Sequence, residues 1–342
     1  MRFFVGLLLL AASAGRLAAQ DFAAEVAKTV QKLEQNKAAA VAGSDGWLFF
    51  GGELRLLSLG RFWGNDAAKV SRAHKPDLAD PIPAILDFQQ QLKARGIELL
   101  VVTVPPKASV YPEKIVPGSD VRAKDPAPAL HQFYDELRAA GVDVLDLGKL
   151  FIEKRDDNRG PVFCKTDSHW SGIGCALAGE AIAERVRGKI PKPVTAKEYV
   201  AEWKEVEREG DLGTLLGRDG HKLPPEKIAV QSVSETGTGA AVQEDPSSPL
   251  LLLGDSHTLI YHDRDFLPVR AGLVDQLALQ LGFAPDLIGT SGSGATPVRI
   301  NLYRRTVKDP AYLAKKKMVV WCFAAREFTE ATEGWAKVPV AK

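Results

Sequence analysis

The sequence predicts an α/β/α sandwich built around a mostly parallel central sheet. The first observation behind this prediction is a set of short, almost continuous apolar runs, the pattern of strands that are buried on both faces. The second is that segments with helical spacing separate these runs, as crossovers between parallel strands require. The chain has 342 residues, of which 45% are hydrophobic and 25% charged, so it is long enough to bury a large core.

The elements follow in order along the chain. Residues 21–43 have helical spacing, and "SDGWLFFGGE" at 44–53 predicts a turn that enters an aromatic strand. Further helices are predicted at 81–96, 127–141, 171–188 and 269–282, with Ser171 as an amino-terminal cap. Apolar strands are predicted at 97–107, 142–148, 249–254, 284–289 and 315–324.

The two ends and one internal stretch differ from this regular body. Residues 1–19 place one Arg before an apolar run of about ten residues and then small residues, the layout of a signal peptide. We expect export to the periplasm, with an uncleaved amino-terminal anchor as the alternative. Residues 20–42 form an amino-terminal helical segment, 43–335 a single domain, and the stretch around 191–248 a less regular insertion.

Charge and cysteine content limit the functional classes. The net charge of +1, from 44 basic and 43 acidic residues, gives no field that would attract nucleic acid, and none is expected as a partner. The run "KEVEREGD" at 204–211 is interpreted as a solvated face. Cys164 and Cys175 could form a disulfide in an exported chain, or stay buried thiols like Cys322; both readings are open.

The tripeptide Asp-Ser-His occurs twice, at 167–169 and 255–257. In the first copy Asp167 and His169 are one residue apart, so both side chains can point the same way, with Ser168 pointing away. An Asp that holds one imidazole nitrogen leaves the other free to accept a serine proton. Copy one therefore supplies the acid and base.

The second copy is predicted to supply the nucleophile. Leu250–Leu253 form a buried strand, Gly254 permits a sharp turn, and Ser256 then stands at the carboxyl end of the strand. The alternative is that Asp255 or Ser256 only caps a helix. His257 is left as a structural residue or a lining of the site.

Further candidates surround these residues. The glycine-rich "GTSGSGATP" at 289–297 follows a short strand, so Ser291, Gly292 or Gly294 can complete an oxyanion hole with the Ser256 N–H, although an ordinary loop is an equal alternative. No cofactor or metal is expected. The metal reading, a minor one, would combine Asp167, His169, Asp255 and His257.

The Gly-Asp-Ser after a buried strand resembles the first sequence block of SGNH hydrolases, and Asp-x-His resembles their acid and base in reversed order. With "GSDGWLFF", "VVTVPPKASVYP", "KTDSHWSGIG" and "KKMVVWCFAAREF", the chain is similar from about Gly43 to Phe328 to the alginate O-acetyltransferases of the AlgJ and AlgX type. The resemblance implies an SGNH-hydrolase-like catalytic domain over 43–335. It also implies Ser256 as nucleophile, His169 as base and Asp167 as its orienting carboxylate.

The same resemblance implies a function in the periplasm. The expected activity is transfer of an acetyl group, through an acyl-serine, to the hydroxyls of a secreted polysaccharide such as alginate. The implied partners are that polysaccharide and a membrane-bound O-acyltransferase that donates the acetyl group. Asp255 and Arg326 join the oxyanion or substrate candidates, with a surface ion pair as the alternative for Arg326. A carbohydrate acetylesterase and a non-catalytic polysaccharide-binding or assembly protein remain as rival readings.

Overall fold

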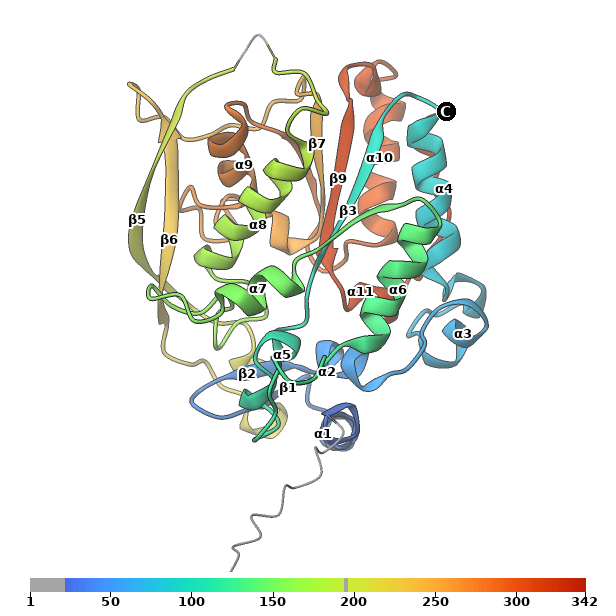
Figure 1. The fold of residues 1–342 in the computed structure, drawn as a ribbon, viewed down its shortest axis with the longest axis vertical. Helices are drawn as coiled ribbons and strands as arrows, with labels where there is room; N and C mark the ends of the chain where they lie inside the picture. The colour runs from blue at the N-terminus through green and yellow to red at the C-terminus, as the bar shows by residue number, and fades with distance from the viewer. Residues whose placement is uncertain (1–21, 194–195) are drawn as a thin grey trace, which may run out of the picture.

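The computed structural model describes residues 22–193 and 196–342 of the chain. Its centre is a five-stranded sheet in the order β4-β3-β9-β7-β8, and every neighbouring pair is parallel (Figure 1). The strands span, in that order, Asp143–Asp146, Glu98–Val104, Met318–Ala324, Leu250–Gly254 and Asp286–Gly289. All five were predicted from their apolar runs.

Helices cover both faces of this sheet (Figure 1). One face is covered by α8 (Gly172–Val186) and α9 (Leu273–Leu281), and the other by α4 (Pro81–Lys93), α6 (Pro128–Ala139) and α10 (Thr296–Lys308). The three middle strands are apolar on both sides because neither side meets water: every residue of β7 and of β9 is buried. The predicted α/β/α sandwich is confirmed.

The start of α8 shows how a sequence cap sets the geometry near the site. The Ser171 hydroxyl accepts hydrogen bonds from the N–H groups of Ile173 (3.2 Å) and Gly174 (3.4 Å). These donors would otherwise have no partner in the first turn. The predicted cap is confirmed, and it fixes where the chain leaves the His169 segment.

The insertion around 191–248 is more regular than its sequence suggested. Strands β5 (Tyr199–Arg208) and β6 (Glu226–Glu235) pair antiparallel over ten residues and form an outer ribbon beyond α8 and α9 (Figure 1). Ile228 and Val230 of β6 are buried, whereas β5 is mostly exposed and carries charges, as edge strands commonly do. Charges on the outer strand hid the alternation expected of a strand.

The amino-terminal segment also differs from its prediction as one helix. Helix α1 (Phe22–Asn36) ends where Lys37 takes a positive φ of 51°. Residues Ala40–Ala42 then form β1, which pairs antiparallel with the aromatic strand β2 (Leu48–Phe50). The remaining short helices are α2 (Gly51–Ser58), α3 (Ala67–Val70), α5 (Lys107–Val110), α7 (Gly148–Lys154) and α11 (Glu327–Glu330).

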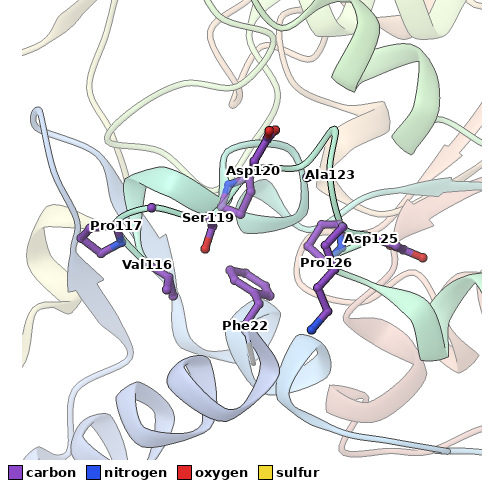
Figure 2. Close-up of a pocket in the computed structure, with 11 residues that line it drawn as sticks. Phe22, Val116, Pro117, Ser119, Asp120, Ala123, Asp125 and Pro126 are labelled. Carbon is purple, nitrogen blue, oxygen red and sulfur yellow. The ribbon is translucent and has the colours of Figure 1, made fainter. Parts of the chain in front are cut away.

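A mostly apolar cavity of about 230 Å³ lies where the amino-terminal segment meets the body of the domain. Phe22 at the start of α1 faces Val116, Pro117 and Pro126 across it (Figure 2). None of its lining residues belongs to the two Asp-Ser-His tripeptides. The predicted signal peptide at 1–19 lies outside the described residues, and among the residues described no helix has the length and apolar character to cross a membrane.

The cysteines are three separate buried thiols. The Cys164 Sγ lies 3.3 Å from the Tyr261 hydroxyl and 3.5 Å from the Trp170 carbonyl oxygen. Of the two readings left open by the sequence, the structure has the free thiols and not the Cys164–Cys175 disulfide.

Candidate active site

The candidate site lies at the carboxyl edge of the sheet. Gly254 of β7 pairs with Cys322 of β9 and with Gly289 of β8, so the three strands end side by side. The segments that leave these ends carry Ser256, the 289–297 loop and Arg326. Ligands of open parallel sheets collect at this edge, because loops diverge there and leave a hollow.

A sharp turn presents Ser256 at this edge. A Cβ on Gly254 would lie 2.0 Å from the Cys322 carbonyl oxygen, so only glycine permits β7 to end this close to β9. Asp255 then accepts hydrogen bonds from the N–H groups of His257 (2.9 Å) and Ala324 (2.7 Å). Ser256 begins the short 3₁₀ turn Ser256–Thr258. The His257 and Thr258 N–H groups are already bound to Asp255, so the amide of this turn that can face a developing oxyanion is the Ser256 N–H.

The two tripeptides meet as the sequence analysis predicted. The Ser256 Oγ lies 2.8 Å from the His169 Nε2, and the His169 Nδ1 lies 2.6 Å from the Asp167 Oδ1. The Asp167 Oδ1 also accepts a hydrogen bond from the His169 N–H at 2.9 Å. This geometry keeps the proton on Nδ1 and leaves Nε2 to accept the hydroxyl proton of Ser256.

Asp167 is fully buried yet remains ionised because its second oxygen also has donors. The Asp167 Oδ2 accepts from the Arg208 Nη2 (2.8 Å) and Nε (3.0 Å) and from the Asp211 N–H (3.2 Å). Burial alone would raise the pKa of Asp167, but the His169 hydrogen bond and the charges of His169 and Arg208 hold that pKa well below its ordinary value. The carboxylate can therefore stabilise an imidazolium on His169.

Lys107, directly after β3, holds the backbone of the first tripeptide. Its buried Nζ lies within hydrogen-bonding distance of three carbonyl oxygens, those of Asp167 (2.6 Å), Leu48 (2.9 Å) and Lys165 (3.3 Å). These contacts use all three donors of an ammonium group. Lys107 thus ties the Asp167 segment to β2 and fixes its position at the sheet edge.

Ser168, the serine of the first tripeptide, is hydrogen-bonded to Asp211 and not to the His169 Nε2. Its Oγ donates to the Asp211 Oδ2 at 2.6 Å, and its N–H donates to the Asp211 Oδ1 at 2.7 Å. Its Oγ lies 3.5 Å from the His169 Nδ1, the nitrogen that Asp167 already occupies. Ser168 has no access to the basic Nε2 and is not activated.

The His257 ring packs against the His169 ring. Its ring centroid lies 4.8 Å from that of His169 and 5.2 Å from that of Trp170. Its Nδ1 lies 3.1 Å from the Asp255 Oδ1, and its buried Nε2 has no partner among the described residues. Burial lowers the pKa of His257, against the opposing charge of Asp255, so a neutral ring packs against His169.

The glycine-rich loop wraps around the Ser256 turn. The Thr290 N–H donates to the Gly254 carbonyl oxygen at 3.0 Å. A Cβ on Gly294 would lie 2.4 Å from the Phe323 Cβ and 3.2 Å from the Asp255 Cβ, so the absence of a side chain permits this contact. Gly294 therefore lies against Asp255, the residue that precedes Ser256.

Three other residues were predicted as oxyanion or substrate candidates. Ser291 and Gly292 are exposed, and Gly292 has a φ of +90° with open space where a side chain would be. Asp255, an oxyanion or substrate candidate, is buried, and its carboxylate accepts hydrogen bonds from backbone N–H groups. Its contacts instead shape the turn that presents Ser256.

Arg326 follows β9 and is half-buried beside the site. Its Nη1 lies 3.2 Å from the Glu53 Oε1, and its guanidinium lies 5.2 Å from the centre of the Phe50 ring. The Glu53 Oε2 in turn accepts the Lys107 N–H at 3.1 Å. The ion pair weighed as an alternative is present, but it is not an ordinary surface pair, since 12% of the Arg326 side chain and 5% of Glu53 are exposed.

Among the described residues, Asp167, His169 and Asp211 form the group that could hold a metal ion, since one possible ligand atom of each lies within 4.8 Å of the others. Their partners are already described: His169 and Arg208 for Asp167, and Ser168 for Asp211. The Arg208 guanidinium supplies positive charge to this cluster. The set differs from the minor metal alternative, which used Asp255 and His257.

Sequence reasoning missed three residues of this site. Arg208 and Asp211 lie in the charge run at 204–211, which is mostly exposed as interpreted. These two residues nevertheless also contact Asp167 and Ser168. Lys107 lies in the "VVTVPPK" segment, where a lysine directly after a buried strand marked the sheet edge. That placement was the one signal available for these residues.

Comparison with known proteins agrees with the fold. The family model described as "SGNH hydrolase-like domain, acetyltransferase AlgX" matches residues 40–323. The protein named "Probable alginate O-acetylase AlgJ" from Pseudomonas aeruginosa is 28% identical over 317 residues, which cover 88% of this chain and 73% of that relative. Its namesake from Pseudomonas putida is 26% identical over 303 residues, covering 86% and 71%.

Solved structures show the same fold. The O-acetyltransferase domain of Pseudomonas putida AlgJ aligns with a TM-score of 0.62 and 23% identity, covering 85% of this chain and 92% of that domain. Pseudomonas aeruginosa AlgX aligns with a TM-score of 0.58 and 18% identity, covering 83% and 61%. Since the family model matches most of the chain, this protein belongs to the SGNH hydrolase-like acetyltransferase family of AlgX.

Proposed function

We propose that this protein is a polysaccharide O-acetyltransferase that carries the acetyl group on Ser256. The observation behind the proposal is the hydrogen-bonded series Ser256–His169–Asp167, with contacts of 2.8 and 2.6 Å, in a chain of the AlgX acetyltransferase family. Relatives named as alginate O-acetylases support a polysaccharide as the acceptor.

The reaction runs in two steps. In the first, the His169 Nε2 takes the hydroxyl proton as the Ser256 Oγ attacks the acetyl carbonyl carbon, and the oxyanion is met by the Ser256 N–H. The imidazolium, stabilised by Asp167, then gives its proton to the leaving oxygen of the donor. In the second step His169 takes the proton of a sugar hydroxyl, which attacks the acyl-serine and restores Ser256.

The setting of the reaction is part of the proposal. The apolar amino-terminal run supports export to the periplasm. A secreted anionic polysaccharide such as alginate would be the acceptor, and a membrane-bound O-acyltransferase the source of the acetyl group. Arg326 offers a cation beside the site, suited to a uronate carboxylate of such an acceptor.

The decisive experiment supplies the mature protein with a chromogenic acetyl ester and a deacetylated alginate oligosaccharide, and measures acetylated glycan and free acetate together. We expect acetylated glycan from the wild type and none from Ser256→Ala. Free acetate without acetylated glycan would make the protein a carbohydrate acetylesterase. No turnover and no acetyl adduct would favour a non-catalytic polysaccharide-binding or assembly role.

A further inference from the structure

One serine hydroxyl lies between two carboxyl groups at the side of the nucleophile turn. The Ser293 Oγ is 2.8 Å from the Glu327 Oε2 and also hydrogen-bonds to the Glu333 Oε1. The same Oγ accepts the Ala295 N–H at 3.4 Å. A hydroxyl has one proton to donate, so it can serve only one of the two carboxyl groups. The other contact needs a proton of its own.

We propose that one carboxyl of the Glu327–Glu333 pair stays protonated and that this proton holds the 289–295 loop against the Ser256 turn. Loss of the proton then lowers the rate of acetyl transfer. In this arrangement Ser293 donates to the ionised carboxylate and accepts from the neutral carboxyl and from the Ala295 N–H. The Ser293 hydroxyl proton, the carboxyl proton and the Ala295 N–H then each meet an acceptor. With both carboxyls ionised, one of them would face the Ser293 lone pairs.

Glu327 is the member of the pair that carries the proton. Its residue surface is 4% exposed, whereas Glu333 is half-buried, so the charge is easier to keep on Glu333. The charged groups that act on Glu327 are Arg326 next to it, Asp255 of the nucleophile turn, and Glu333. Burial raises the pKa of Glu327 to about 7, and the charge of Arg326 opposes this rise while those of Asp255 and Glu333 add to it.

The bridge joins two segments that both border the nucleophile. On one side, the loop packs on the turn through Gly294 at Asp255 and through the Thr290 N–H at the Gly254 carbonyl oxygen. On the other side, Glu327 belongs to α11, directly after Arg326. Separation of the two carboxylates by repulsion would therefore move the loop that packs on the Ser256 turn.

The sign of the pH effect follows from the raised pKa. Because the folded protein binds this proton more tightly than an unfolded chain, the stabilisation is complete at acid pH and is lost as the pH rises through the pKa of folded Glu327. The transfer rate is expected to decline on the alkaline side. This inference rests on the proposed function for its rate measurement, but not for its stability measurement.

The test measures kcat/KM for a chromogenic acetyl ester from about pH 6 to about pH 9. The wild type should lose rate about tenfold per pH unit above this ionisation. Glu327→Gln and Glu333→Gln should both abolish the decline, since either amide donates to Ser293 without a titrating proton. Glu330→Gln is the matched control on the same helix, because Glu330 contacts Arg55 and not Ser293, and it should keep the wild-type profile.

A second measurement does not need turnover. The Tm of the wild type should fall relative to that of Glu327→Gln as the pH rises from the ordinary glutamate pKa of 4.5 to the folded value of about 7, and the difference should level off above it. An unchanged alkaline decline in both amide variants, together with parallel Tm profiles, would overturn the shared proton. If the wild type has no esterase or transferase activity, the proposed function fails while the Tm profiles still decide the inference.

Discussion

The two Asp-Ser-His tripeptides have the same local hydrogen bonds and opposite uses. In each copy the Asp Oδ1 accepts the N–H of the His two residues on, at 2.9 Å, and also contacts its Nδ1, at 2.6 Å in the first copy and 3.1 Å in the second. What differs is the far side of each ring. The His169 Nε2 faces the Ser256 Oγ, whereas the His257 Nε2 is buried without a partner among the described residues.

This difference shows that the Asp-x-His geometry is a property of the local backbone, while the role of each residue is set by its neighbours. The Asp167 Oδ2 is held by Arg208, a cation, and the Asp255 Oδ2 by the Ala324 N–H, which anchors the turn to β9. In the first copy the serine is bound to Asp211. In the second it begins a helical turn at the sheet edge.

The largest expected effect is on the serines. Ser256→Ala should lower kcat for acetyl-ester turnover by about 10⁴-fold or more, because it removes the hydroxyl that contacts the His169 Nε2. Ser168→Ala, the matched variant in the other tripeptide, should change the rate by less than about threefold, because the Ser168 Oγ contacts Asp211 and not the His169 Nε2. A large loss in Ser168→Ala with activity kept in Ser256→Ala would reverse the roles of the two copies.

Asp167→Asn should have the next largest effect. The amide can present its N–H₂ group to the His169 Nδ1 and so favour the wrong imidazole tautomer, a change that lowers kcat by about 10⁴-fold in serine proteases. Steady-state kinetics on folded protein, checked by circular dichroism, measures it. A rate within tenfold of the wild type would mean that Asp167 does not orient the base.

Arg208→Gln tests the difference between Asp167, which a cation holds, and Asp255, which a backbone N–H holds. The change removes a charged donor from the Asp167 Oδ2, and hydrogen bonds to charged groups contribute about 1.5–3 kcal/mol. We expect kcat to fall by about ten- to a hundredfold, with KM for a small ester little changed. Lys204→Gln on the same strand is the control, since Lys204 is exposed, and equal losses in both variants would contradict the assigned contact.

His257→Gln should have the smallest effect. The ring makes no contact with reacting atoms, and a glutamine can still donate to Asp255, so we expect a rate within about fivefold of the wild type and a loss of stability of about 1–3 kcal/mol from the altered packing. His169→Gln is the comparison, and it should be nearly inactive. Similar rates in the two variants would show that His257 also takes part in proton transfer.

Much of the fold could be predicted, because buried parallel strands are apolar throughout and helices carry their own caps. Leu250–Leu253 and the Ser171 cap are examples that the structure confirms. The β5–β6 ribbon could not be predicted in this way, since β5 faces solvent and its charges obscure the period of two. Helix α10, which follows the glycine-rich loop, was also missed.

The central contacts of the site were predictable from the two tripeptides, whereas its supports were not. Asp167, His169 and Ser256 were placed by motif and strand position. Arg208 and Lys107 reach Asp167 from 41 and 60 residues away in the chain. The position of Lys107 after a strand indicated the sheet edge but not the group it contacts, and Arg208 carried no such sign. The long-range position of a charged side chain depends on the tertiary fold.

The central claim is that the acetyl group is held on Ser256 after activation by His169. Its most direct test is peptide mapping by mass spectrometry of protein quenched during turnover of an acetyl ester. The account predicts one acetyl group on the peptide that contains Ser256 in the wild type, and none there in His169→Ala. Acetyl on the Ser168 peptide, or equal labelling of Ser256 without His169, would contradict it.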